Sequence, residues 1–350
     1  MLMLHKVLEE FGIPASDIRA LPFGTGLINH TWKVKINGGE KTFILQRING
    51  NVFKNPKDIA CNVQLIAEYL ATHYPSYLFV RPLKSNHGQG LAYVEGEGYF
   101  RMMPYILKSH SLDVVQNAKQ AFEAAKQFGR FTRLLSGFDV SKLKVTIPDF
   151  HNLPLRYRLF EESTVQGNPE RIALALEKIN CMKELSFLVE RFSEMERRGV
   201  FKLRVTHHDA KISNVLFDKQ NHGLCVIDLD TVMPGYFISD VGDMMRTYLS
   251  PVSEEERDFS KIVIREEYYK AIVEGYLSEM KGELSEEEKK CFFDAGCFLV
   301  YMQALRFMTD YLNNDRYYGA KSEGQNFYRA CNQLVLLRRL LEKENQLRAI

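Results

Sequence analysis

Apolar and polar positions alternate with period two through much of the first hundred residues. Apolar residues and lysines alternate over 31–36, a turn of Asn and Gly follows at 37–39, and a mostly apolar run fills 42–48. Such alternation around an Asn-Gly turn predicts a β-hairpin with one half-buried strand. A second hairpin is predicted from 91–94 and 99–103, which a glycine-containing turn joins.

Helical spacing replaces this alternation elsewhere. Apolar residues recur at 59, 63, 66 and 70, behind Pro56, and predict a helix between the two hairpins. After Pro104, helical stretches cover 124–135, 172–195, 265–280 and most of 290–345, with a β-like island at 203–230. The pattern predicts an α+β fold with two lobes and a hinge near 103–108. The small β-rich lobe spans residues 1–103, and the larger, mainly helical lobe spans residues 104–350.

The composition excludes several classes of function. The 350-residue chain carries 46 Lys and Arg against 44 Asp and Glu, without a basic block, which argues against nucleic acid as a partner. No run approaches the ~18 apolar residues that a membrane span needs. The six cysteines lie far apart, without metal-ligand spacing, and are expected to be reduced thiols. We therefore expect a cytoplasmic protein that binds neither nucleic acid nor membrane.

The segment 207–214 carries the strongest chemical signal. Its spacing H-x-D-x-K-x-x-N contains Asp209, Lys211 and Asn214, and Asp228 ends a short apolar run further on. This is the spacing of the protein-kinase catalytic loop. Phosphoryl transfer needs a carboxylate at the acceptor hydroxyl, a cation at the γ-phosphate, and oxygen ligands for Mg²⁺. Asp209 and Lys211 suit the first two roles, and Asn214 with Asp228 suits the third.

Turn chemistry is the alternative explanation of this segment, because Asp and Asn are common where strands end in solvent. Several residue types at kinase spacing, behind a β-rich lobe, favour a catalytic site instead. Within it, His207 is expected to buttress the loop, His208 to act as a spacer, and Asp240 to anchor the loop backbone.

Over nearly its whole length the sequence resembles the aminoglycoside phosphotransferase/choline kinase family of small-molecule kinases. The segments that carry the likeness are 21–32, 43–53, 208–218 and 304–312. Within that family they are most similar to the N-acetylhexosamine 1-kinases. The resemblance implies a bilobal protein-kinase-like fold that uses ATP and Mg²⁺, with the nucleotide held by the N-terminal lobe.

Two stretches of the N-terminal lobe are candidates for nucleotide binding. Gly24 and Gly26 precede the first predicted strand and suit a glycine loop over the phosphates, although Asn29 stands at the third position of G-x-G-x-x-G. Met103 and Tyr105 lie at the predicted hinge, where backbone groups would bind the adenine edge. The resemblance implies ATP, and the side chains do not distinguish ATP from GTP.

The ion pair that protein kinases place on the third strand and the following helix is missing. The lysine position falls on Gln46 and the acidic position falls on Asn62, so both members are amides. Arg47 lies on the other face of an ideal strand and reaches the phosphates only if a bulge shifts the register. We expect either Gln46 or Arg47 to contact the α- and β-phosphates.

Recognition of the acceptor is expected in the helical lobe. Arg306 stands in an otherwise apolar stretch and needs a partner, which could be a structural salt bridge or a bound sugar. Its place in the segment similar to hexosamine kinases makes the sugar an equal alternative. Asp243, Arg246, Tyr317 and His30 are further candidates for substrate contact.

These expectations combine into a kinase of small molecules, a monomer or homodimer that transfers the γ-phosphate of ATP to a sugar hydroxyl. The resemblance favours the anomeric hydroxyl of an N-acetylhexosamine. Other acceptors, namely an aminoglycoside, choline or ethanolamine, or homoserine, form the first alternative. The amides at Gln46 and Asn62 suggest a second alternative, a catalytically inactive kinase fold that acts as a binding module.

Overall fold

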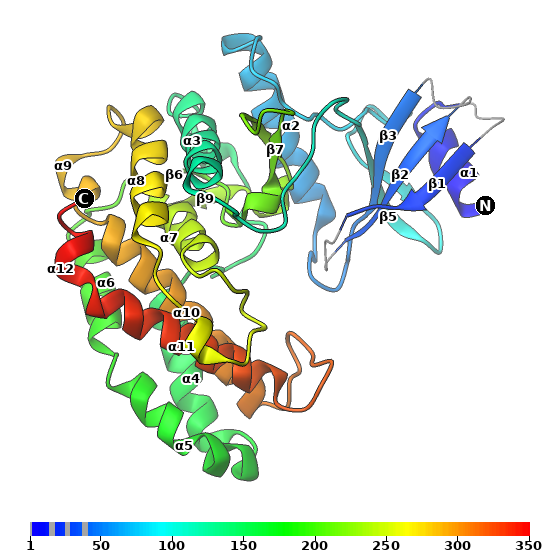
Figure 1. Ribbon diagram of the computed structural model, residues 1–350. Coiled ribbons are helices and arrows are strands. Elements are labelled where there is room, and N and C mark those ends of the chain that lie inside the picture. The colour runs from blue at the N-terminus through cyan, green and yellow to red at the C-terminus, as the bar shows by residue number, and fades with distance from the viewer. Residues whose placement is uncertain (1, 14–17, 25–28, 37–40) are drawn as a thin grey trace.

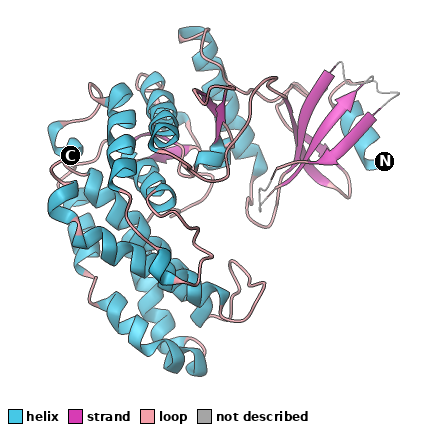
Figure 2. Ribbon diagram, viewed as in Figure 1, coloured by secondary structure: helices cyan, strands magenta, loops and turns pink. Residues whose placement is uncertain are grey.

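Five antiparallel strands form one sheet near the N-terminus, and helices make up most of the rest (Figures 1 and 2). The computed structural model describes residues 2–13, 18–24, 29–36 and 41–350. In sequence order the strands are β1 Ile18–Pro22, β2 His30–Ile36, β3 Lys41–Arg47, β4 Ala92–Val94 and β5 Gly98–Pro104, and their order in the sheet is β1-β2-β3-β5-β4. The strand pairing of both predicted hairpins is confirmed, and the predicted turn at 37–39 lies outside the described residues.

The two faces of the sheet have different surroundings. Leu45 is fully buried in a hydrophobic core that helix α1, Leu2–Glu10, completes. Gln46 and Arg101 are register partners on the opposite face, as the alternation along β3 predicts. The pairing of β3 with β2 and β5 runs without a register shift. No bulge therefore interrupts the paired residues 41–47, and Arg47 stays on the same face as Leu45.

The C-terminal part is built around a central helix, α10, in which nearly every side chain is buried. Helices α4, α7 and α11 pack against α10, and α3 packs along α8 (Figure 1). Gly242 in α7 permits close approach, because a Cβ atom there would lie 2.3 Å from the Ala295 carbonyl oxygen of α10. The long helices are α3 Ala118–Leu134, α4 Leu153–Gln166, α5 Pro169–Lys183, α6 Phe187–Arg197, α7 Phe237–Tyr248, α8 Glu266–Met280, α10 Phe292–Leu312 and α11 Gln325–Glu342. Two short helices, α9 Glu286–Lys289 and α12 Glu344–Leu347, complete this part.

The predicted β-like island is confirmed as four short strands between α6 and α7. They are β6 Arg204–Thr206, β7 Val215–Phe217, β8 Gly223–Val226 and β9 Met233–Gly235. β6 pairs with β9 and β7 with β8, so the segment that follows β6 and the segment that follows β8 are held close together.

Helix α2, Pro56–His73, packs with the helical part. Its apolar residues, Ile59 and Ile66 among them, share one hydrophobic core with α3, against which Tyr99 of β5 also packs, whereas the other face of the sheet and α1 have a separate core. Asn62 strengthens this attachment, since its Nδ2 donates to the carbonyl oxygens of Lys144 and Val232 at 2.8 and 3.0 Å. The packing of α2 thus crosses the division that the sequence predicts at residues 103/104.

Several elements differ from their predicted extents. Helix α2 and helices α3 and α8 form where helical spacing predicts them. The predicted helix over 172–195 is two helices, α5 and α6, and the stretch 290–345 is interrupted over 313–324. The sequence did not predict α1, β1 or α4. Their patterns are weak: β1 buries no residue fully and α4 buries few, so neither has a complete apolar stripe.

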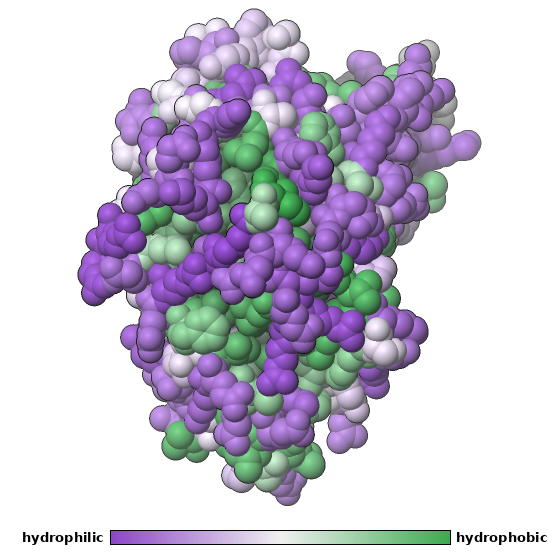
Figure 3. Space-filling model, turned by 60° about the vertical axis from the view of Figure 1, so that its left-hand side comes forward, coloured by the Kyte–Doolittle hydropathy of each residue, from purple (hydrophilic) through white to green (hydrophobic). Residues whose placement is uncertain are grey.

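Hydrophilic side chains cover most of the face shown in Figure 3, where apolar side chains gather only in small separate groups. Among the described residues, no helix combines the length and the hydrophobicity that crossing a bilayer requires.

Candidate active site

A buried carboxylate fixes the backbone of the loop that follows β6. Asp240, in the first turn of α7, accepts hydrogen bonds from the backbone N–H groups of His207 at 3.1 Å and His208 at 2.7 Å. These bonds hold His208 in a left-handed conformation, with φ of 66°. Burial raises the pKa of Asp240 to about 6. The predicted anchoring role of Asp240 is confirmed.

His207 connects the two acid-ended segments. Its Nε2 lies 2.9 Å from the carbonyl oxygen of Ile227, next to Asp228, and its Nδ1 lies 3.4 Å from the backbone nitrogen of Asp209. Both contacts are satisfied when Nε2 carries the proton and Nδ1 accepts. The ring packs edge-on against Phe128 at a centroid distance of 5.1 Å. His207 therefore buttresses the loop, as predicted.

Asp209, Lys211 and Asn214 lie together at the end of this loop. Lys211 Nζ is 2.9 Å from Asp209 Oδ1, and Asn214 Nδ2 donates to Asp209 Oδ2 at 3.0 Å. Burial acts to raise the pKa of Asp209, but the Lys211 ammonium and the Asn214 hydrogen bond outweigh burial and lower the pKa. The Asp209 carboxylate also raises the pKa of Lys211. The pair is therefore ionised at neutral pH, with an accepting oxygen beside a cation.

Asp228 places its carboxylate at the edge of the site. Its backbone is left-handed, with φ of 61°, and its side chain is 43% exposed at the edge of the site. Burial of the surrounding site and the nearby Asp230 raise the pKa of Asp228 to about 7, so its charge lacks full compensation. Asn214 Nδ2 donates to Asp209, so the Oδ1 atom of Asn214 is the one that could bind a cation.

These donors fit Mg²⁺, which takes one or two protein oxygens and completes its coordination with phosphate and water. The described residues hold no group of three His, Cys, Asp or Glu side chains arranged around a metal. Asn214 and Asp228 would therefore supply the protein ligands.

The residues predicted to contact phosphates are separated by the sheet. Gly24 has φ of 81°, a conformation that glycine adopts at little cost, whereas Gly26 lies outside the described residues. Gln46 donates to Thr31 Oγ1 at 3.1 Å and accepts from Arg101 Nε at 2.8 Å. Arg47 lies on the other face, 39% exposed and 3.4 Å from Glu97. The structure thus does not bring Gln46 and Arg47 together.

Arg101 is a residue that sequence reasoning missed. It belongs to β5, is buried, and forms an ion pair with Asp230, which follows Asp228 by two residues. Asn29 also donates to Asp230, at 2.6 Å. Two residues of the N-terminal sheet region therefore contact one carboxylate of the segment between β8 and β9. The available signal was an arginine within the apolar strand sequence Tyr-Phe-Arg-Met-Met, which needs a partner when buried.

The hinge candidates lie at the end of β5 and just beyond it. Met103 pairs with Ile44, and the Tyr105 N–H donates to the Thr42 carbonyl at 3.1 Å. The Tyr105 ring lies beneath Lys33, whose Nζ is 3.6 Å from the ring centroid. The Tyr105 N–H is therefore already used in this conformation.

The acceptor candidates fall into three separate settings. Arg306 lies beside Tyr317, to whose hydroxyl it donates at 3.4 Å. Asp243 and Arg246 form an ion pair at 2.8 Å, with one Asp243 oxygen buried and without a described hydrogen-bond partner. His30 is exposed on the sheet, on the face of Arg47 and away from the other four.

Aromatic side chains connect Arg306 to the catalytic loop. The guanidinium carbon lies 5.2 Å from the Phe150 ring centroid, Phe150 stacks on His151 at 4.5 Å, and the His151 ring lies 5.3 Å from that of His208. His208 is the neighbour of Asp209 in the chain. Phe150 and His151 were not predicted, because they lie in an irregular segment without a motif.

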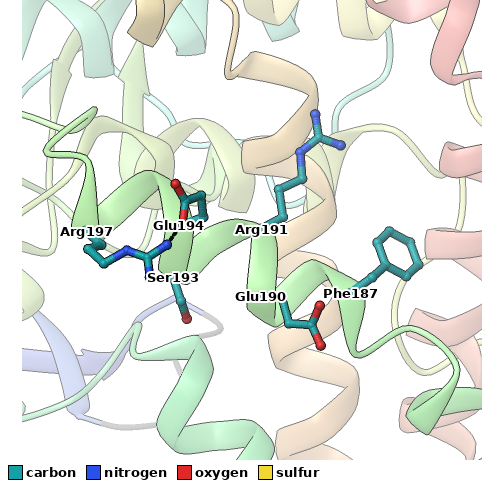
Figure 4. A pocket seen from close by; sticks show the side chains of 6 residues that line it. All are labelled: Phe187, Glu190, Arg191, Ser193, Glu194 and Arg197. Carbon is teal, nitrogen blue, oxygen red and sulfur yellow. Dashed lines mark ion pairs between the residues drawn. The ribbon is translucent and has the colours of Figure 1, made fainter.

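A hollow on helix α6 is unrelated to this site (Figure 4). Its lining includes Glu190, Arg191 and Arg197, and the arginines are paired with Asp294 and Glu194. None of the residues 207–230 lines this hollow.

Solved kinases share the fold of this chain. An aminoglycoside phosphotransferase from Alicyclobacillus acidocaldarius matches with a TM-score of 0.63 at 11% identity, over 95% of this chain and 93% of that one. A spectinomycin phosphotransferase in complex with ADP and spectinomycin gives 0.61 at 13% identity, over 98% of both chains. Plasmodium vivax ethanolamine kinase gives 0.59 at 13% identity, over 92% of this chain and 82% of that one. The bilobal kinase-like α+β fold is thereby established.

The chain also matches a known family at the level of sequence. The pattern of the phosphotransferase enzyme family matches residues 19–283, which run from β1 to the turn after α8, and the chain belongs to that family. The closer likeness to N-acetylhexosamine 1-kinases stays a prediction.

Proposed function

We propose that the protein is an ATP- and Mg²⁺-dependent kinase of a small hydroxyl compound, and that the acceptor is the anomeric hydroxyl of an N-acetylhexosamine. The observation that carries the kinase is the grouping of Asp209 with Lys211 and Asn214 across from Asp228. Family membership and the ADP complex of a protein with the same fold agree with a nucleotide donor.

Each side chain of the group has a distinct task. Asp209 accepts the hydrogen of the acceptor hydroxyl and orients its oxygen toward the γ-phosphate. Lys211 places a positive charge beside the transferring group. Asn214 and Asp228 would hold Mg²⁺, which when bound neutralises phosphate charge. Asp240 and His207 keep these groups in place through the loop backbone.

Aromatic rings with nearby cations support a sugar as acceptor. Arg306 lies among Phe150, Tyr317 and Tyr318, with its guanidinium carbon 5.2 to 5.8 Å from the three ring centroids. Its hydrogen bonds go to Gln303 and the Tyr317 hydroxyl, and no described carboxylate pairs with it. A sugar offers apolar ring faces and hydroxyl or carbonyl oxygens, which suit these aromatic rings and this donor.

The charge of this region disfavours cationic acceptors. Burial and the nearby positive charge of Arg306 both lower the pKa of Arg156. The Arg156 Nε is buried without a described hydrogen-bond partner. Arg246, in contrast to Arg156 and Arg306, pairs with carboxylates, those of Asp243 at 2.8 Å and Glu254 at 2.7 Å. A polyamine or a choline headgroup would meet unpaired positive charge here.

An ATP-consumption screen over sugars, amino alcohols and antibiotics tests the proposal. We expect turnover with an N-acetylhexosamine and a product whose phosphate is acid-labile and, by ³¹P and ¹H NMR, bonded to C1. Phosphate on C6 would refute the 1-kinase assignment but keep a sugar kinase. Turnover with choline or an aminoglycoside alone would refute the sugar. Binding of Mg-ADP without any turnover would indicate the inactive binding module.

A further inference from the structure

The N-terminal sheet lacks the usual cation at the position where kinases bind the α- and β-phosphates. Gln46 occupies that position on β3, and its amide is held by Thr31 and Arg101. Asn62, at the acidic position of the helix, is turned to the backbone of Lys144 and Val232. Neither amide carries a charge, so a cationic side chain for the nucleotide phosphates must come from another residue.

Arg101 lies one strand away, on the same face of the sheet and opposite Gln46 in the register. Two of its three side-chain nitrogens are anchored: Nε donates to Gln46 Oε1 at 2.8 Å, and Nη1 pairs with Asp230. The third, Nη2, makes no hydrogen bond to a described residue and lies 3.8 Å from Asp228 Oδ1. The guanidinium is therefore fixed in orientation, with its free Nη2 directed to Asp228.

We propose that Arg101 binds the nucleotide phosphates in place of the missing β3 lysine, and that Asp230 positions it as the helix acid does in that pair. The inference rests on the proposed function, because it assumes a nucleotide bound at Asp228. The cation has moved from β3 to β5, and its acidic partner has moved from α2 to the segment that follows the metal ligand.

The anchoring makes Arg101 well suited to this task. Only 6% of its side chain and 4% of the Asp230 side chain are exposed, so little entropy remains to be lost when a phosphate binds. The free Nη2 carries two N–H groups in the guanidinium plane, and charged N–H donors of this kind suit phosphate oxygens. Asn29 adds a third hold by donating to Asp230 at 2.6 Å.

Two other cations of the sheet, Lys33 and Arg47, are directed elsewhere. Lys33 is on the same face, but its Nζ lies over the Tyr105 and Phe23 rings, 3.6 and 5.5 Å from the centroids. Arg47 is on the opposite face and pairs with Glu97. Of the described cations on β2, β3 and β5, Arg101 is thus the one aimed at Asp228.

Nucleotide binding without turnover tests the proposal. The affinities of Mg-ADP and of adenosine are measured by calorimetry for the natural protein and for Arg101→Gln. We expect ADP affinity to fall at least tenfold and adenosine affinity to change less than twofold, because adenosine has no phosphate for Arg101 to bind. Arg47→Gln is the matched control, and its ADP affinity should stay within twofold.

Removing one member of a buried ion pair can impair folding, so a second variant carries the same test. Arg101→Met combined with Asp230→Leu removes both charges and replaces them with apolar side chains. A folded double variant should show the same selective loss of ADP. Unchanged ADP affinity in either folded variant, or an equal loss of adenosine, would overturn the phosphate role. A natural protein that binds no ADP would refute the proposed function instead.

Discussion

The side-chain amide of Asn62 holds the carbonyl oxygen of Val232 at 3.0 Å and joins α2 to the segment just behind Asp228 and Asp230. The same amide exchanges two further hydrogen bonds with the backbone of Lys144, at 2.8 Å each. Asn62 is fully buried. An amide is the side chain that can satisfy a backbone donor and two backbone acceptors at once, which a carboxylate cannot do.

Asn62→Ala should therefore lower the free energy of unfolding by about 1–3 kcal/mol, because three backbone groups, of which that of Val232 is buried, lose their partners. Urea denaturation measures this change. Gln64→Ala is the matched control on the same helix, where the side chain bonds only to exposed Glu68, and should change stability by less than about 0.5 kcal/mol. A loss of ADP affinity in Asn62→Ala at unchanged stability would contradict this structural role.

The Asp240 carboxyl predicts a pH dependence of stability. Its pKa in the folded protein is raised by burial to about 6 from the ordinary 3.8, so the folded state holds the proton more tightly than the unfolded chain. Its contribution to stability therefore falls as pH rises from about 4 to about 6. Asp240→Asn cannot take up this proton. Its free energy of unfolding, followed by denaturation between pH 4.5 and 6.5, should decline less than that of the natural protein, and equal declines would refute the assignment.

Asp209→Asn should lower kcat by about 10²–10⁴-fold, since the amide cannot accept the hydroxyl proton. The Kd for Mg-ADP should change only a few-fold, because Asp228 and Asn214 remain. Steady-state kinetics with the acceptor found in the screen and ADP calorimetry measure the two quantities. Asp218→Asn, on the nearby turn where Asp218 contacts His222, is the control and should retain activity. Near-native kcat in Asp209→Asn would rule out the mechanism.

Arg306→Gln should raise the KM for the acceptor about tenfold or more and leave the KM for ATP unchanged, since the proposed function has the acceptor bound by Arg306 and the aromatic rings around it. Arg257→Gln is a geometric control, because its guanidinium also lies over a tyrosine ring, 4.4 Å from the Tyr328 centroid, but on an exposed surface. If both variants lose stability and neither shifts the acceptor KM, Arg306 has a structural role only.

The sequence predicts those parts of the fold and the site whose signals are contiguous. The first hairpin follows from alternation around an Asn-Gly turn, the second from two β-type runs joined by a glycine-containing turn, and helix α2 from its apolar spacing behind Pro56. The grouping of Asp209, Lys211 and Asn214 follows from a single loop whose residues are at most five positions apart. Spacing along one segment translates directly into proximity when the segment is short.

The remaining features depend on contacts between distant segments. Arg101 and Asp230 are 129 positions apart, and Asn62 and Val232 are 170 apart, so no local pattern links either pair. The apolar stripe of α2 shows that the helix is buried on one side, but it does not show which partner covers it. The face on which Arg47 lies likewise follows only from the observed register, because the alternation of the sequence does not exclude a bulge in β3.

The separate hydrophobic cores of the sheet and of the helical part also affect how the protein responds to temperature and salt. If the sheet with α1 turns as a body, its own core can stay intact, and the contacts that change are those of Arg101 and Asn29 with Asp230 and the packing of Tyr99 against the other core. Such a movement hydrates charges and exposes little apolar surface, so its heat-capacity change is small. Its equilibrium would therefore vary weakly with temperature and more strongly with ionic strength.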